Sequence, residues 1–191
     1  MKTLRQSVIA LAILTIITGI IYPLVVYGIG QILFKYQANG SIIVENGKAV
    51  GSELIGQQFS QPKYFWSRPS ATGNYAYNGL ASGGSNFGPL NPQLVEAVKE
   101  RVTVLQTSNH NNTQIPIDLV TASGSGLDPE ISIAAAYYQM PRIAQIRHIS
   151  VSQLQELVDR NTRYPLFGLF GEARVNVLNL NLALDKLKGE Q

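Results

Sequence analysis

An uncharged apolar run near the N-terminus most limits what this 191-residue chain can become. No charged residue occurs from Gln6 to Phe34, where 27 consecutive residues read VIALAILTIITGIIYPLVVYGIGQILF. A helix that crosses a bilayer needs about 20 such residues. A signal peptide is the competing interpretation, but its apolar part spans only about 7–15 residues before a small-x-small cleavage site, which Gly28-Ile29-Gly30 matches poorly. We therefore predict an uncleaved transmembrane helix over residues 7–34.

Charge gives the expected orientation of this helix. Lys2 and Arg5 precede it, Lys35 follows it, and these three residues account for the whole net charge of +3, because residues 36–191 carry twelve basic and twelve acidic side chains. Since basic residues favour the cytoplasmic side, we predict a cytoplasmic N-terminus (residues 1–6) and an extracytoplasmic domain (residues 35–191). The basic character is thus a membrane-flank effect and argues against a nucleic-acid partner.

One face of the predicted helix carries small and hydroxyl side chains. Thr15, Gly19 and Tyr22 follow i, i+4, i+7 spacing, with Thr18 beside them. Such residues allow helices in lipid to approach closely and to form hydrogen bonds, so we predict a packing face for a partner helix. The alternative is that an anchor simply tolerates them. Pro23 is expected to kink the helix.

The remainder of the chain predicts a single small α+β domain without cysteine. Asn46-Gly47 predicts a tight hairpin turn between two strands. Residues 57–92 show little periodicity but are rich in aromatic side chains, which favours an ordered, packed loop over disorder. The expected later elements are a helix over 92–106, a strand or extended run over 115–129, a helix from Ser132 to Tyr138 interrupted by Pro141, a helix over 151–162, and a strand and a helix within 172–189.

A glycine-rich loop supplies the one feature typical of nucleotide sites. Ser82, Gly83, Gly84, Ser85 and Asn86 resemble the LSGGQ signature of ABC ATPases and could hold a phosphate. The alternative, which the sequence favours, is that Gly83 and Gly84, like Gly124 and Gly126 of a second glycine-rich run, occupy turns that need glycine. The chain has neither a P-loop nor a G-x-S-x-G nucleophile motif, and its two histidines lack metal-site spacing.

Four runs together resemble the C subunits of the Kdp potassium-transporting ATPase. They are GSELIGQQFSQPKYFWSRPSA, SGGSNFGPLNPQL, DLVTASGSGLDPEIS and GEARVNVLNLNLALD, and the likeness covers nearly the whole chain. One departure is Glu130, where we expect a histidine in many members. The resemblance implies a bacterial inner-membrane protein with a single span.

The same resemblance implies a non-catalytic accessory subunit of a high-affinity, ATP-driven potassium importer. Its partners would be a potassium channel-like subunit, a P-type ATPase subunit, a small membrane peptide and the lipid bilayer. The implied role is to assemble or stabilise the complex. The alternative is a catalytic chaperone that raises the ATP affinity of the ATPase subunit, with nucleotide contact at the SGGSN loop. The chain is expected to have no cofactor of its own, and direct ATP contact conflicts with an extracytoplasmic domain.

The aromatic loop offers candidates for subunit docking. Tyr64, Phe65, Trp66 and Arg68 are residue types that dominate interface energies, so we predict that they contact the channel-like subunit. The alternative is that they pack inside the domain.

The missing cysteines allow a direct test of the predicted orientation. In the intact membrane complex carrying Ser85→Cys, a membrane-impermeant thiol reagent is expected to label this subunit in right-side-out vesicles and not in inverted ones, with unlabelled partner chains as the background control. Labelling only from the cytoplasmic side would overturn the orientation and favour the phosphate-binding interpretation.

Overall fold

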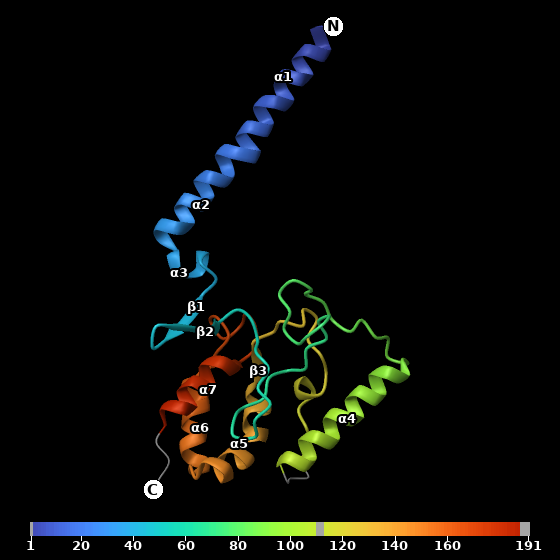
Figure 1. The fold of residues 1–191 in the computed structure, drawn as a ribbon, viewed down its shortest axis with the longest axis vertical. Helices are drawn as coiled ribbons and strands as arrows, with labels where there is room; N and C mark the ends of the chain where they lie inside the picture. The colour runs from blue at the N-terminus through green and yellow to red at the C-terminus, as the bar shows by residue number, and fades with distance from the viewer. Residues whose placement is uncertain (1, 110–112, 188–191) are drawn as a thin grey trace. The chain divides into compact units, whose positions relative to one another are not determined.

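The computed structural model describes residues 2–109 and 113–187, and the chain divides into two compact units, Met1–Ile43 and Val44–Gln191. The first unit is largely one apolar helix, and the second contains nearly all of the β-strand residues and the later helices (Figure 1). The structure thus confirms the predicted class, an N-terminal apolar helix followed by a small α+β domain. Each unit is described separately below.

The N-terminal unit consists of α1 (Lys2–Ile16), a π-helical turn η1 (Ile17–Ile21), α2 (Tyr22–Leu33) and a short α3 (Lys35–Ala38). From Lys2 to Leu33 the described chain forms a single helical stretch of 32 residues that is long and apolar enough to cross a membrane. This stretch covers nearly all of the predicted span and extends it at its N-terminal end.

A widened turn lies directly before Pro23. The N–H of Tyr22 donates to the carbonyl of Ile17, five residues earlier, which is the hydrogen-bond pattern of a π-helix. Proline lacks an N–H and its ring crowds the preceding turn of a regular α-helix. Pro23 instead occupies the first turn of α2, where proline is tolerated. Pro23 was expected to kink the helix. The irregularity associated with it is a π-turn inside a continuous helical stretch.

The hairpin has the predicted turn. Strands β1 (Ile42–Glu45) and β2 (Lys48–Ser52) form a two-stranded sheet. Asn46 and Gly47 between them have φ angles of 50° and 75°, the two positive values that a type I′ turn requires.

A second, three-stranded antiparallel sheet lies within the C-terminal unit. Its order is β3 (Glu130–Ser132), β5 (Arg174–Asn176) and β4 (Thr162–Arg163), so the last strand in sequence is the central one. Ile131 and Thr162 both pair with Val175 of β5. Helices α5 (Ile133–Arg147) and α7 (Val177–Lys186) contact this sheet, and α6 (Val151–Arg160) packs against both of these helices (Figure 1).

Side-chain caps begin two of these helices where the sequence predicts them. The hydroxyl of Ser132 accepts a hydrogen bond from the N–H of Ala135 at the start of α5. Ser150 and Gln153 form a reciprocal capping box at the start of α6. Helix α4 (Pro92–Asn109) also begins as expected, with the Asn91 side chain accepting from the N–H of Gln93.

Two expectations about this part of the chain are wrong. Helix α5 continues through Pro141 to Arg147 instead of being interrupted. Pro141 is exposed while Met140 and Ile143 on either side are buried, so core packing on both sides offsets a cost of about 3 kcal/mol. Within the run 115–129, expected to be a strand or extended, Ile117–Leu119 form a 3₁₀ turn, η2, and the other residues form neither helix nor strand.

One hydrophobic core joins the sheet, the helices and part of the irregular segment (residues 53–91) between β2 and α4. Its fully buried apolar side chains include Phe65, Ala135, Ala136, Ile143, Leu154, Val158, Val175, Leu180 and Leu184. Phe65 comes from the irregular segment, so this segment is anchored in the core even though the described residues of it form neither helix nor strand.

Buried amide side chains supply the hydrogen bonds that a neighbouring strand would otherwise provide to this segment. On α7, Asn181 accepts from the Phe65 N–H at 2.9 Å and donates to the Phe65 carbonyl at 3.0 Å. On α5, Gln139 does the same for Trp66, at 2.7 Å and 3.2 Å. Both side chains are buried. These pairs satisfy main-chain groups that would be costly to bury alone.

A buried arginine extends the network. The guanidinium of Arg142, on α5, donates to the Pro62 carbonyl at 2.6 Å, to Gln139 at 2.8 Å and to the side chain of Asn109 at 3.1 Å. It also lies 4.1 Å from the centroid of the Trp66 ring, a cation–π contact. Burial lowers the pKa of Arg142 to about 10. The group remains charged at neutral pH, so these contacts replace its water.

Replacement of Asn181 should therefore destabilise the domain. Asn181→Leu keeps the branched shape of the side chain but leaves the N–H and carbonyl of Phe65 unpaired, and we expect a loss of roughly 2–4 kcal/mol of unfolding free energy. The measurement is urea unfolding of the detergent-solubilised chain, followed by the fluorescence of Trp66, the only tryptophan. The matched control is Asn179→Leu in the same helix, which should cost much less. Equal losses in both variants would contradict the role of the Asn181 bridge.

Candidate functional site

The predicted nucleotide loop packs against the second glycine-rich turn. The N–H of Gly83 and the hydroxyl of Ser82 both donate to the Ser125 carbonyl, at 2.8 Å and 3.0 Å. A Cβ added at Gly84 would lie 3.1 Å from the carbonyl oxygen of Gly124. The two turns thus meet main chain to main chain, and a side chain at Gly84 would be crowded by this approach.

Gly126 completes this contact. Its φ of 67° lies in the left-handed region, and an added Cβ would lie 2.5 Å from Thr72 Cγ2 and 2.7 Å from the Gly83 carbonyl oxygen. The hydroxyl of Ser70 donates to the Gly126 carbonyl at 2.7 Å. Glycine is therefore required at this position both by backbone conformation and by space.

Ser85 and Asn86 lie outside any helix or strand. Asn86 has a φ of 52°, and α4 begins only at Pro92, with its first turn already bonded to Asn91. A phosphate site at a helix N-terminus instead aims free N–H groups at the anion. The occupied N–H of Gly83 and the distance of this loop from the start of α4 favour the interpretation that the glycines serve packing, and phosphate binding at this loop stays an untested alternative.

The four predicted docking residues differ in accessibility. Phe65 is 0% exposed, so the role predicted for its side chain is wrong, and it belongs to the core instead. Trp66 is partly buried against Arg142. Tyr64 donates to Asp185 at 2.9 Å. Only a residue's surroundings in the fold distinguish a buried aromatic from a docking aromatic, and the local sequence does not contain them.

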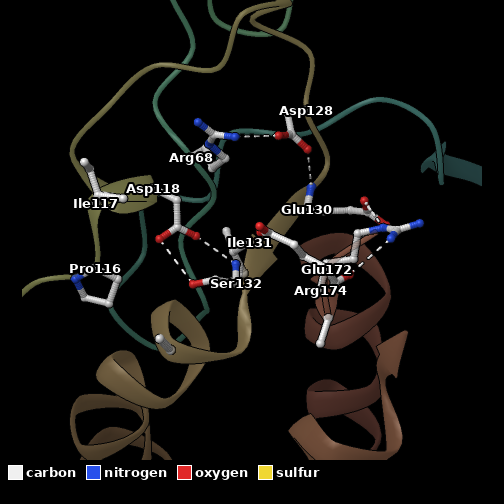
Figure 2. Close-up of a pocket in the computed structure, with 12 residues that line it drawn as sticks. Arg68, Pro116, Ile117, Asp118, Asp128, Glu130, Ile131, Ser132, Glu172 and Arg174 are labelled. Carbon is white, nitrogen blue, oxygen red and sulfur yellow. Dashed lines mark hydrogen bonds and ion pairs between the residues drawn. The ribbon is translucent and has the colours of Figure 1, made fainter. Parts of the chain in front are cut away.

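Arg68 lines a charged pocket of about 490 Å³ at the edge of the three-stranded sheet (Figure 2). Its guanidinium lies 2.9 Å from a carboxylate oxygen of Asp128. Across the pocket, Arg174 Nε lies 2.6 Å from a carboxylate oxygen of Glu130. These pairs connect the irregular segment, the run before β3, and strands β3 and β5, and they give Glu130 a partner suited to a carboxylate.

Asp118 forms the third polar contact in the pocket. Its carboxylate accepts from the N–H and the hydroxyl of Ser132, at 2.7 Å and 3.2 Å, and so fixes η2 against the start of α5 (Figure 2). These charged side chains therefore bind one another and the main chain. Within the described residues, no three histidine or acidic side chains are grouped as metal ligands. His148 is exposed at the end of α5, and His110 lies outside the described residues.

Tyr77 links two parts of the irregular segment beside this pocket. Its hydroxyl donates to the Arg68 carbonyl at 2.5 Å. Burial, with a smaller contribution from the Asp128 charge, raises the pKa of Tyr77 above its ordinary value, so the phenol stays a donor at neutral pH.

Exposed apolar side chains on the irregular segment were missing from the predicted site. Leu80 is 96% exposed and Leu90 is 94% exposed, and Tyr75 and Phe87 also contact solvent. These four residues, called the loop patch, flank the SGGSN loop. The sequence signal for these exposed residues was a leucine that follows glycine (Leu80) or lies between proline and asparagine (Leu90), outside any helical or strand periodicity.

In the N-terminal helix, the predicted packing residues lie around the π-turn. A Cβ added to Gly19 would lie 3.9 Å from Thr15 Cγ2, so these two positions share a face. The Thr18 hydroxyl donates to the Leu14 carbonyl at 2.7 Å. Tyr22 directly follows the π-turn, and its N–H donates to the Ile17 carbonyl.

These observations define a class: a membrane-type protein in which one N-terminal apolar helix carries a small α+β domain. The family model described as "KdpC: K+-transporting ATPase, c chain" matches residues 4–186. The chain belongs to the KdpC family.

Curated relatives agree over nearly their full length. The chain is 56% identical over 186 residues to the potassium-transporting ATPase KdpC subunit of Janthinobacterium sp. (strain Marseille), covering 97% of this chain and 98% of that protein. It is 55% identical over 185 residues to the protein of the same name from Methylococcus capsulatus, covering 96% and 97%. For the one from Polaromonas naphthalenivorans the identity is 54% over 186 residues, covering 97% and 95%.

The glycine turns offer a matched test of the packing role. Gly126→Ala should lower the unfolding free energy by roughly 2–3 kcal/mol, because the new Cβ meets both a left-handed backbone and the Gly83 carbonyl. Gly124→Ala, two residues away, should be close to neutral, because no described atom lies within 4 Å of its Cβ position outside its chain neighbours. Thermal or urea unfolding of both variants measures this, and equal stability would contradict the close approach.

Proposed function

We propose that this chain is an accessory, non-catalytic subunit of a high-affinity, ATP-driven potassium import complex. Support comes from the KdpC family match and from relatives named as subunits of a potassium-transporting ATPase. The carrying structural observation is the loop patch, because four apolar side chains exposed on an ordered segment favour a surface that a partner covers.

The loop patch is proposed to dock on the channel-like subunit. It combines apolar side chains with the serine, asparagine and glycine of the SGGSN region, a mixture suited to a protein surface with its own polar groups. The buried network at the start of the same segment supports this role. Asn181, Gln139 and Arg142 order the start of the segment, so less conformational entropy is lost when a partner binds.

The N-terminal helix is proposed to cross the inner membrane once, with the domain outside, and to pack beside the channel-like subunit. The ATPase subunit and the small membrane peptide are then the remaining partners. The helix has the length and composition for this, and Thr15 and Gly19 offer a close approach to a neighbouring helix.

Any influence on ATP is proposed to pass through the complex. A domain outside the membrane can change the ATP affinity of a cytoplasmic site only if its contacts differ between two states of the assembly. The SGGSN loop supports this view, because Ser82 and Gly83 already donate to the Ser125 carbonyl. The role of a catalytic chaperone is therefore compatible with the proposal as an indirect effect.

Replacement of the patch leucines tests the docking surface. Leu80→Ser with Leu90→Ser should lower recovery of the channel-like subunit with the tagged chain from detergent extracts roughly tenfold, equivalent to about 1.4 kcal/mol of binding free energy. Both side chains are almost fully exposed, so the variant should keep its unfolding transition.

The control for this experiment is Val151→Ser, which changes an exposed apolar residue on α6. Undiminished recovery of all partner subunits with the double variant, at equal expression, would contradict docking through the loop patch. Equal losses in the double variant and the control would also contradict it.

A further inference from the structure

A second exposed apolar surface lies between β4 and β5. The sequence from Tyr164 to Gly171 is YPLFGLFG, and no charged residue occurs between Arg163 and Glu172. Phe167 is 83% exposed and Leu169 is 80% exposed, and Tyr164, Leu166 and Phe170 are exposed as well. Residues 164–171 are called the apolar tip.

The apolar tip closes on itself through its main chain. Leu166 and Phe170 form an antiparallel bridge with N–H to carbonyl distances of 3.2 Å and 3.1 Å. The N–H of Leu169 also donates to the Leu166 carbonyl, and Phe167 and Gly168 between them have φ angles of 54° and 71°. Several main-chain groups of the tip are paired locally. Its transfer into an apolar medium therefore costs less free energy than the transfer of an open loop.

The composition of the tip differs from that of the loop patch. Its only side-chain polar atom is the Tyr164 hydroxyl, whereas the loop patch alternates with serine and asparagine. Aromatic and leucine side chains are the usual contacts of proteins with the interfacial layer of a bilayer. Arg163 and Arg174, at the base of the tip, are both exposed. Each pairs with a carboxylate, of Glu53 and Glu130 respectively, and the remaining N–H groups of each guanidinium can bind lipid phosphates.

The chain length keeps this domain close to a membrane. Only residues 34–43 separate the end of α2 at Leu33 from the C-terminal unit, and ten residues reach at most about 35 Å. A domain of this size has a radius of gyration of about 15 Å, so every part of its surface can reach the bilayer that the helix crosses. Because the tether holds the domain near the membrane, even a surface with low intrinsic affinity for lipid meets a high effective concentration of it.

We infer that the apolar tip inserts Phe167, Leu169 and their neighbours into the interfacial layer of the bilayer in which the N-terminal helix is anchored. The tip is thus a second membrane contact of the chain. It goes beyond the proposed subunit role, because it needs no partner protein.

The test uses the full chain, without partner subunits, in vesicles of phosphatidylethanolamine and phosphatidylglycerol. The chain has no cysteine, so Phe167→Cys provides a single site for an environment-sensitive fluorophore. Ser152→Cys, on the exposed start of α6, is the matched control. We expect blue-shifted emission and quenching by lipids with a nitroxide near the headgroup at position 167, and neither at position 152.

A second substitution measures the contribution of a neighbouring side chain. Adding Leu169→Ser to the labelled chain should lower the ratio of inserted to free tip roughly tenfold, because burial of one leucine is worth about that factor. Trp66 fluorescence of each variant should match that of the unmodified chain, which confirms an intact fold.

Two results would overturn the inference. One is a probe at position 167 that is as water-exposed and as weakly quenched as the probe at position 152. The other is a probe that becomes shielded only when the partner subunits are added and is still not quenched by the labelled lipids, which would assign the tip to a protein interface.

Discussion

The structure of the C-terminal unit depends on pairing the main chain of a segment that has no strand beside it. Asn181 and Gln139 each form two hydrogen bonds to one residue of the irregular segment, and Arg142 binds a third carbonyl. Buried main-chain groups without such partners would cost about 1–3 kcal/mol each. The side-chain amides therefore allow Phe65 to enter the core. The buried Phe65 in turn anchors the exposed remainder of the segment to the domain.

Arg142 shows why this network is specific. A buried guanidinium requires many acceptors, and the acceptors here are carbonyl and amide oxygens together with the face of Trp66. Removal of one member would leave polar groups of the others buried without a partner, at the cost of their desolvation free energy. The network therefore functions as a unit. The pocket around Arg68 is organised differently, since its ion pairs are partly exposed and each contributes less.

The sequence predicts the features that depend on near neighbours. Asn46-Gly47, Ser132 and Ser150 each signal a turn or a cap within a few residues, and the structure confirms all three. Features set by distant partners were missed. Pro141 stays inside a helix because both its neighbours are buried, and Phe65 is buried because Asn181, 116 residues away, binds it. For the candidate site, each glycine turn was visible separately, but their contact was not.

The distance along the chain between these partners has a consequence for synthesis. The irregular segment is translated early, but its bridging residues lie 73 and 116 positions later, the last of them on α7 near the C-terminus. These contacts cannot form before their later partners have been synthesised, and their long sequence separation slows their formation further. The segment that carries the loop patch thus acquires its final shape only when translation is almost finished, so an incomplete chain, even if already held in the membrane, presents no ordered docking surface.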